Sequence, residues 1–390
     1  MSAKKSVPEL RFKGFSGEWE EQQLKEVVEF IGTGKSTFNL STKKVGNKLY
    51  PVLGSRAVIG YDSKYDYLGN FILTARVGEN AGKLYTYSGK VKISDNTVYI
   101  KTENLDYFYY FLTKFDLSKL AFGTGQPLIK SSELSNLKLF LPNKQEQTKI
   151  GNYFQNLDKL IEQKEKKYQK LGQLKKAILE KMFPKEGATT PEIRFKGFSG
   201  EWEEKGLDSI SEQISYGLTV RPKYIEVGIP LISARELKNG NINYNLAPKI
   251  SIKSYNELSE KAKARKGDIF LTKTGTVGLS AYVRENFPIA ITQNIAVIRV
   301  VNRQYNHQFI LQTFKTQNFY KKSISQVNQS TIMDLQLQDI RKLLISFPNK
   351  QEQTKIANSL QKLDNLIDLQ NQELQKLKNI KKASLAKMFV

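Results

Sequence analysis

The stretch PELRFKGFSGEWEE at Pro8–Glu21 returns as PEIRFKGFSGEWEE at Pro191–Glu204, with a single substitution. A second stretch, PNKQEQTKI, occurs at Pro142–Ile150 and again, letter for letter, at Pro348–Ile356. Internal self-similarity of this kind is the sequence signature of a repeated architecture. The segments between the repeats hardly resemble each other in sequence. We therefore expect a duplicated frame that carries two diverged inserts.

Each copy of PNKQEQTKI opens a long amphipathic segment. Over Ile150–Met182, and again over Ile356–Met388, mostly apolar residues recur at alternating steps of four and three. A sustained repeat of 3.5 residues is typical of a coiled-coil seam. Helices of about 35–40 residues would each span roughly 55–60 Å. The sequence therefore predicts two long helices, each following one variable segment.

Polar residues interrupt the two seams at matching steps. Lys164 and Gln370 mark the first interruption, and Lys175 and Lys381 mark the second. Matched polar layers are a common device for fixing the register of a coiled coil. Because near-identical seams in one chain pair most economically with each other, we expect an antiparallel coiled coil. Two separate surface helices, each packed on its own module, are the alternative.

The variable segments have the pattern of mixed α/β modules. Short apolar runs bounded by turn residues, such as Tyr50–Leu53 and Asp268–Thr272, predict strands. Asp106–Leu120 and the region His307–Lys321 predict helices. The expected fold is α+β, with two α/β modules and two long helices related by a pseudo-two-fold repeat. The expected segments are a first module at 1–141, a first helix at 142–184, a second module at 185–347 and a second helix at 348–390.

The charge of the chain points to a polyanionic partner. Lys and Arg number 61 against 38 Asp and Glu, which gives a formal net charge of +23 spread over the whole length. Such an excess is typical of nucleic-acid binding, whereas a membrane-surface protein would gather its lysines on one amphipathic helix. The chain has no apolar run long enough to span a membrane, no apolar stretch typical of a secretory signal near its start, and no cysteine. We expect a cytoplasmic protein without a membrane partner.

The two inserts keep a common skeleton. Pro51–Arg56 aligns with Pro230–Arg235, and Gly69–Thr74 aligns with Gly267–Thr272. Further matches pair Asn96 with Asn294 and the segment 125–129 with 328–332. The loop residues around these matches differ, as expected for two modules that read different DNA sequences.

Loop residues with long donor side chains are the candidates for DNA contact. Arg can bond guanine, Asn or Gln can bond adenine, and Lys or Thr can bond phosphates. Arg56 and Arg235, at equivalent strand ends, are the first candidates for contacts with bases. The other candidate DNA-binding residues lie on neighbouring loops and are Arg76, Lys83, Gln126, Lys130, Lys273, Thr274 and Gln329.

Motifs for catalysis are not found. Ile31–Ser36 (IGTGKS) looks like a phosphate-binding loop, but Glu29 stands where the first glycine of that motif belongs. The chain has a single histidine, His307, in a polar stretch where we expect it to be solvated. No adenine-methyltransferase motif or convincing cofactor fingerprint is present. We therefore expect no catalytic residue, no metal site and no cofactor bound by this chain.

Two variable α/β modules alternating with two repeated coiled-coil helices resemble the DNA-specificity (S) subunit of type I restriction–modification enzymes, the HsdS family. The resemblance covers the whole chain. Its most specific parts are the paired RFKGFSGEWEE and PNKQEQTKI stretches and the twice-occurring Pro-x-x-x-x-Arg and Gly-(Asn/Asp)-x-x-Leu-Thr segments. It implies that each module is a target recognition domain for one half of a bipartite, asymmetric DNA target, and that the coiled coil sets the spacer.

The same resemblance implies the partners. Two modification subunits would dock on the repeated regions and methylate adenine with S-adenosylmethionine, and restriction subunits would add ATP-driven translocation and cleavage. S-adenosylmethionine, ATP and Mg are thus expected on partner subunits, around a non-catalytic specificity subunit bound to double-stranded DNA.

Three other functions are compatible with parts of the sequence. A stand-alone sequence-specific or architectural DNA-binding protein would share the basic modules, and co-purification with a methyltransferase distinguishes it. A nuclease or methyltransferase in its own right would need an acidic metal cluster or a cofactor motif, and the sequence has neither. A coiled-coil scaffold that assembles proteins without DNA is disfavoured by the charge of +23 and is tested by a gel shift at low salt.

Overall fold

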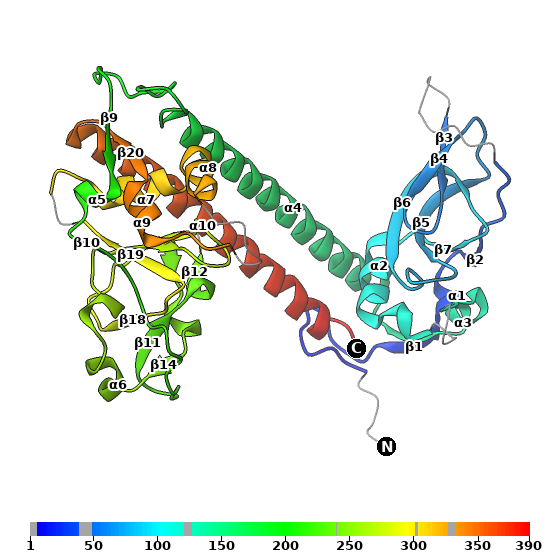
Figure 1. Ribbon diagram of the computed structural model, residues 1–390. Coiled ribbons are helices and arrows are strands. Elements are labelled where there is room, and N and C mark those ends of the chain that lie inside the picture. The colour runs from blue at the N-terminus through cyan, green and yellow to red at the C-terminus, as the bar shows by residue number, and fades with distance from the viewer. Residues whose placement is uncertain (1–5, 39–48, 121–126, 239, 301–302, 327–332) are drawn as a thin grey trace. The chain divides into compact units, whose positions relative to one another are not determined.

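The computed structural model describes residues 6–38, 49–120, 127–238, 240–300, 303–326 and 333–390 (Figure 1). The chain forms two compact units: unit 1 is Met1–Lys166 with Asn371–Val390, and unit 2 is Lys167–Gln370. Each unit combines one variable α/β module with one part of each long helix. The α/β modules and long helices predicted from the sequence are confirmed.

Six strands form the main sheet of unit 1, in the order β2-β7-β5-β6-β3-β4. Neighbouring strands are antiparallel except β3 and β6, which run parallel. In β5, Phe71 and Leu73 face one core cluster and Ile72 faces another, so both faces of the strand are buried. The bounds are β2 Phe30–Thr33, β3 Tyr50–Leu53, β4 Val58–Asp62, β5 Tyr67–Ala75, β6 Leu84–Ile93 and β7 Thr97–Lys101.

The helix expected over Asp106–Leu120 is interrupted. It is present as α2 (Leu105–Phe115), followed by a 3-10 turn at Leu117–Leu120. Asp116 between them has a left-handed backbone with φ 64°, which ends α2. Four of the six aromatic residues of α2 are buried in the core, which is a packing role and not a surface for stacking bases: Tyr107, Phe108, Tyr110 and Phe111.

Unit 2 builds the same framework from two smaller sheets, ordered β10-β19-β16-β17 and β14-β11-β18-β15. The long strand β6 of unit 1 corresponds to two separate strands here, because β17 pairs with β16 while β18 runs parallel to β11. The bounds are β10 Gln213–Tyr216, β11 Ile229–Ile232, β14 Lys249–Ile250, β15 Lys263–Ala264, β16 Ile269–Thr272, β17 Ser280–Tyr282, β18 Ile289–Ile291 and β19 Ile295–Arg299.

The helical region of unit 2 is also divided, into α7 (His307–Phe314) and α8 (Gln317–Ser325). The Thr316 hydroxyl caps α8 by accepting a hydrogen bond from the backbone N–H of Phe319 at 3.2 Å. His307 is not solvated as expected. It is half-buried, 5.9 Å from the Tyr282 ring, and burial lowers its pKa below the ordinary value of 6.5.

Short elements complete both units. In unit 1, β1 (Glu20–Gln23) pairs with β8 (Lys138–Leu141), and in unit 2, β9 (Glu203–Gly206) pairs with β20 (Leu344–Phe347). A short helix follows β1 and β9, and another precedes β8 and β20, so the frame is duplicated. The remaining short elements are α1 Leu24–Val27, α3 Ser131–Ser135, α5 Leu207–Ile210, β12 Leu237–Lys238, β13 Asn241–Ile242, α6 Ile252–Asn256, α9 Leu337–Lys342 and 3-10 turns at Ala234–Glu236, Tyr244–Leu246 and Glu260–Ala262.

The two repeated stretches are bonded to each other within each unit. In unit 1, the guanidinium of Arg11 donates two hydrogen bonds of 2.7 Å to the carboxylate of Glu146, which is fully buried. In unit 2, Arg194 and Glu352 repeat this pair with both distances again 2.7 Å. A two-pronged arginine–carboxylate pair is specific in geometry as well as charge. The repeated sequences therefore preserve one structural joint, made twice.

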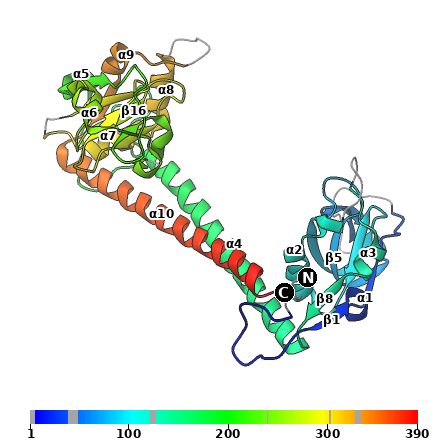
Figure 2. The same ribbon diagram turned by 90° about the horizontal axis from the view of Figure 1, so that it is seen from below.

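The long helices are α4 (Lys144–Lys181) and α10 (Lys350–Lys387), within the predicted segments. Within each unit, the segment of α4 lies alongside the segment of α10 (Figures 1 and 2). In unit 1, Lys164 bonds Glu373 at 2.5 Å and Tyr153 bonds Ser384 at 3.0 Å, which is antiparallel pairing. No helix among the described residues is long and apolar enough to cross a membrane.

The second polar step of each seam has an acidic partner. In unit 1, Lys381 pairs with Asp158 at 2.5 Å, and in unit 2, Lys175 pairs with Asp364. These aspartates stand at equivalent positions of the two helices. Three of the four polar interruptions predicted from the sequence, Lys164, Lys175 and Lys381, are therefore ion pairs between α4 and α10.

Candidate nucleic-acid interface

Several turns of unit 1 meet at one end of its sheet. Three backbone hydrogen bonds join them: Ser94 N–H donates to Leu53 C=O at 3.0 Å, Arg76 N–H to Asn96 C=O at 2.9 Å, and Ile129 N–H to Arg76 C=O at 2.9 Å. Arg76 follows β5, Asn96 lies between β6 and β7, and Ile129 precedes α3. These turns therefore form one loop edge, although they are far apart in sequence.

The same bonds form a loop edge in unit 2. Thr292 N–H donates to Ile232 C=O at 2.9 Å, Lys273 N–H to Asn294 C=O at 2.9 Å, and Leu335 N–H to Lys273 C=O at 2.7 Å. The parallel strand pairs support the same equivalence, since Leu53 pairs with Ile93 in unit 1 and Ile232 pairs with Ile291 in unit 2. Arg56 and Arg235, each three residues beyond the joint after β3 or β11, are thus structurally equivalent.

Other correspondences differ from the sequence alignment. Lys273 occupies the place of Arg76, because Ala75 pairs with Thr97 in unit 1 while Thr272 pairs with Ile295 in unit 2. The alignment had matched Thr74 with Thr272, one residue away. Near the end of each module, Leu335 makes the bond that Ile129 makes, whereas the alignment had matched Ile129 with Ile332. Strand pairing, rather than residue similarity, sets these correspondences.

Arg56 and Lys83 come together at the loop edge of unit 1. Arg56 has an exposed side chain that forms an ion pair of 3.3 Å with Glu79 and donates a hydrogen bond to Asn80. The Lys83 ammonium donates to the same Asn80 Oδ1 at 3.1 Å. These two candidates therefore form one exposed polar cluster on the turns after β3 and β5.

Arg76 and Lys130 are exposed on the same edge of unit 1. The backbone bond between Ile129 and Arg76 brings the turn before α3 against the turn after β5. The structure thus gathers four of the candidate residues of unit 1 on one edge. Gln126, the fifth, lies outside the described residues, as does Gln329 of unit 2.

Arg235 lies on the 3-10 turn after β11 in unit 2. The Ser233 hydroxyl and the Glu236 carboxylate cap this turn reciprocally, and the Arg235 side chain is left exposed. It lines an open hollow of about 700 Å³ together with Arg221 and Tyr224. The Arg221 guanidinium lies 5.2 Å from the centre of the Tyr224 ring. This hollow combines two arginines with an aromatic face, which suits a nucleic acid.

Lys273 and Thr274 are engaged with a carboxylate. The Lys273 ammonium lies 2.7 Å from Asp334 Oδ1, and the Thr274 hydroxyl donates to the same oxygen at 2.6 Å. Burial alone would raise the pKa of Asp334, but hydrogen bonds from Lys273 and Thr274 hold it below the ordinary 3.8. The positive charge of Lys273 is therefore largely neutralised by Asp334.

Sequence reasoning missed Arg221, Tyr224 and Asp334. Arg221 and Tyr224 lie in a segment that no alignment between the modules covered. Asp334 had a usable signal, since it precedes the repeated Pro348 by the same number of residues as Leu128 precedes Pro142. Counting back from the repeats would have matched Leu128 with Asp334.

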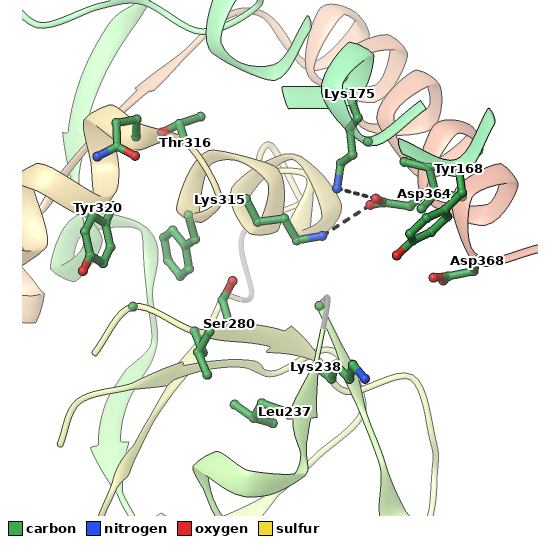
Figure 3. Close-up of a pocket in the computed structure, with 17 residues that line it drawn as sticks. Tyr168, Lys175, Leu237, Lys238, Ser280, Lys315, Thr316, Tyr320, Asp364 and Asp368 are labelled. Atoms are coloured by element: carbon green, nitrogen blue, oxygen red, sulfur yellow. Dashed lines mark hydrogen bonds and ion pairs between the residues drawn. The ribbon is translucent and has the colours of Figure 1, made fainter. Parts of the chain in front are cut away.

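A separate hollow of about 570 Å³ in unit 2 lies where α4 and α10 meet the module (Figure 3). Lys175 and Lys315 point toward Asp364, and Lys315 Nζ lies 3.3 Å from its Oδ2. Burial would raise the pKa of Asp364, but the charges of the two lysines lower it below 3.8. We interpret this cluster as a joint between the long helices and the module.

No group of three or more His, Cys, Asp or Glu side chains that could hold a metal ion occurs in the part of the chain that the structure describes.

Comparisons with known proteins agree on one family. A family model for the type I restriction modification DNA specificity domain matches residues 16–173 and 200–379. The chain is 23% identical over 397 aligned residues to the type I restriction enzyme MjaVIII specificity subunit of Methanocaldococcus jannaschii, covering 94% of this chain and 90% of that protein. It is 26% identical over 200 residues to the EcoBI specificity subunit of Escherichia coli, covering 48% of this chain and 41% of that protein.

Solved structures show the same fold. The S subunit of a type I restriction–modification system from M. genitalium superposes with a TM-score of 0.67 at 17% sequence identity, covering 98% of this chain and 99% of that chain. A chain from a study of type I system assembly and conformational transition superposes with a TM-score of 0.54 at 16% identity, covering 95% and 97%.

Proposed function

The chain belongs to the type I restriction–modification DNA specificity family, and on this basis we propose that each unit reads one half of a bipartite, asymmetric DNA target. The observation that carries the proposal is the pair of loop edges. The same backbone bonds build both edges, yet the side chains presented there differ between the units. One framework with two sets of side chains is what the recognition of two different half-sites requires.

The chemistry of the edges supports DNA as the ligand. Arg56 in unit 1 and Arg235 in unit 2 present guanidinium groups at equivalent positions, and a guanidinium can bond the O6 and N7 atoms of guanine. Arg76, Lys83 and Lys130 supply positive charge for phosphates in unit 1. The net charge of +23 favours strong, salt-sensitive binding to double-stranded DNA.

The duplicated joint supports a pair of identical partners. Because the pairs Arg11–Glu146 and Arg194–Glu352 form the same joint twice, two modification subunits would dock, one beside each copy. Restriction subunits would join the same complex. The antiparallel long helices would set the number of base pairs between the half-sites.

The modification and restriction subunits would carry out the chemical reactions. The chain is a non-catalytic specificity subunit and binds no cofactor, while S-adenosylmethionine, ATP and Mg are used by the modification and restriction subunits. Such a complex acts on chromosomal DNA and hence in the cytoplasm.

A map of N6-methyladenine across the host genome, with and without this gene, tests the proposal. We expect methylation to disappear at one split, asymmetric motif when the gene is removed. The motif would give both half-sites and the spacer at once. If purified complex containing a modification subunit then methylates no two-part motif, the chain would be a stand-alone DNA-binding protein instead.

A further inference from the structure

An isolated β-bridge occurs at the same place on both loop edges. It joins Val77 with Leu128 in unit 1 and Thr274 with Asp334 in unit 2. In each unit it directly follows the backbone bond that Arg76 or Lys273 accepts at the edge. The bridge position is therefore equivalent in the two units, although its residues share no chemistry.

The backbone around the bridge is also the same. Gly78 N–H donates to Pro127 C=O at 2.9 Å in unit 1, and Gly275 N–H donates to Met333 C=O at 2.9 Å in unit 2. Both glycines have positive φ, 93° and 79°, which turns the chain away after the bridge. A difference in binding at this position would thus come from the side chains.

In unit 1 the bridge presents apolar surface. Val77 is 38% exposed and Leu128 is partly buried. They lie between the exposed Arg76 and Lys130, so this apolar surface is within a cationic edge. In the major groove, the C5-methyl group of thymine is the apolar feature that such side chains contact.

In unit 2 the bridge presents a hydrogen-bond acceptor. Asp334 Oδ1 accepts from Lys273 at 2.7 Å and Thr274 at 2.6 Å, while Oδ2 accepts from the Gln336 amide. A carboxylate offers about four acceptor positions, and these described side chains use three of them. The Asp334 side chain is 29% exposed. One acceptor position thus remains on an accessible carboxylate.

The charge at this bridge argues against a phosphate as its contact. Asp334 repels phosphate, and Lys273 neutralises Asp334 instead of offering a free cation. The hollow of about 420 Å³ beside them is lined by further polar side chains, including Gln293 and Asn294. A neutral, polar hollow with a spare acceptor suits the edge of a base that carries an amino group. Cytosine N4 and adenine N6 are the amino groups of the major groove.

On the premise of the proposed function, we infer that the bridge is a matched base-reading position whose chemistry differs between the units. Asp334 accepts a hydrogen bond from the amino group of cytosine or adenine in the half-site of unit 2. Val77 and Leu128 contact the methyl group of thymine at the equivalent place in the half-site of unit 1. Lys273 and Thr274 are positioning residues that orient Asp334.

The test transplants the apolar bridge into unit 2. The complex with its modification subunits, carrying wild-type chain, Asp334→Asn or the double change Thr274→Val/Asp334→Leu, is offered a duplex DNA library randomised at every half-site position. Bound duplexes are sequenced at two salt concentrations. We expect the double change to shift preference from cytosine or adenine toward thymine, at least tenfold, at one position of the unit 2 half-site.

The Asn variant separates the two amino-bearing bases. An amide can bond adenine through N6 and N7 but matches cytosine poorly, so a retained preference identifies adenine and a lost one identifies cytosine. The unit 1 half-site is the internal control for assembly, and Glu257→Gln is the matched control for removing an exposed carboxylate in unit 2. Both variants release the Lys273 ammonium from its counter-charge, so any gain in salt-sensitive affinity should be equal for all sequences and should not alter the base preference.

Three results would overturn the inference: no altered position in either variant, an equal change at all positions of the unit 2 half-site in both, or an equal loss of affinity for all sequences. Failure of the proposed function looks different, because the wild-type complex would then select no two-part motif at all.

Discussion

Arg56 and Arg235 are equivalent in position but differ in their surroundings. Arg56 is tied to Glu79 across an exposed surface, whereas Arg235 lines a hollow beside Arg221. An exposed ion pair contributes about 0–1 kcal/mol. Arg56 can therefore exchange Glu79 for DNA at small cost, and both arginines are available to bond bases.

We predict that Arg56→Ala weakens recognition of one half-site and Arg235→Ala weakens recognition of the other. A two-pronged arginine–guanine contact is worth about 1–3 kcal/mol of discrimination, so preference at one base pair should fall by roughly 5- to 150-fold. Selection from a randomised duplex library by each variant complex measures this. The preference at the other half-site should stay as in the wild type.

Arg265→Ala is the matched control, because Arg265 is also exposed and ion-paired, with Glu260 at 2.9 Å, but lies away from the loop edge. It should leave both half-sites unchanged. If Arg56→Ala and Arg235→Ala altered the same half-site, the model of one unit for each half-site would be wrong.

The candidate residues could be predicted only in part from the sequence. The equivalence of Arg56 and Arg235 could be predicted, because both close a similar six-residue segment. The neutralisation of Lys273 could not, because Asp334 lies 61 residues further along the chain and only strand pairing brings them together. That these candidate residues contact DNA is still a prediction.

At the scale of elements, the joints between the long helices and the modules follow one plan with different chemistry. Asp158 of α4 bonds Lys381 of α10 and the hydroxyl of Tyr110 at 2.7 Å in unit 1. In unit 2, Asp364 of α10 bonds Lys175 of α4, and the module contributes Lys315 instead of a tyrosine. Each aspartate therefore ties the other long helix and its own module together.

We predict that Asp364→Asn destabilises unit 2 by about 1–3 kcal/mol, because it leaves two mostly buried lysines without their shared counter-charge. The side chain of Asp364 is 16% exposed, so solvent compensates for little of the loss. Thermal unfolding of the full chain measures the effect as a lower transition temperature. Asp368→Asn, on the same hollow, is the matched control and should change the transition little.

The stability difference between the wild type and Asp364→Asn should depend on pH. The pKa of Asp364 lies below 3.8 in the folded chain, so its stabilisation is complete above that value and is lost as pH falls through the folded pKa. The difference between wild type and variant should be constant from about pH 6 to 8 and should shrink below about pH 4. A difference that grew in acid would contradict the assigned role.

The long helices were predictable and the shorter ones only in outline. A seam of mostly apolar residues over many turns leaves few alternatives to a helix, and α4 and α10 lie within the predicted segments. The breaks at Asp116 and Thr316 were missed, because apolar periodicity continues across both. A left-handed residue and a capping hydroxyl decide those ends, and both are weak signals in a sequence.

At the scale of the whole molecule, two units share two continuous helices. The boundary between the units falls inside α4, after Lys166, and inside α10, after Gln370. The repeats predicted the duplicated frame, but with each long helix as a segment of its own. The first polar interruption of each seam, Lys164 or Gln370, lies at this boundary, but the heptad spacing itself continues through it.

We predict that four residues inserted into both helices lengthen the DNA spacer that the complex accepts. The insertions go between Gln163 and Gln169 in α4 and into the corresponding segment Leu369–Gln375 of α10. Four helical residues add about 6 Å at 1.5 Å each, which is about one to two base pairs at roughly 3.4 Å each. Selection from libraries that hold both half-sites fixed and vary the spacer measures the change.

The same four residues inserted after Ala188, in the exposed segment before the second repeat, are the matched control. That insertion leaves both helices intact, so the preferred spacer should stay as in the wild type. Since the half-sites are read by the loop edges, both insertions should leave the base preferences unchanged. If the insertion into both helices changed neither the base preferences nor the preferred spacer, the helices would not determine the distance between the half-sites. Their length would then have been altered without effect on the target.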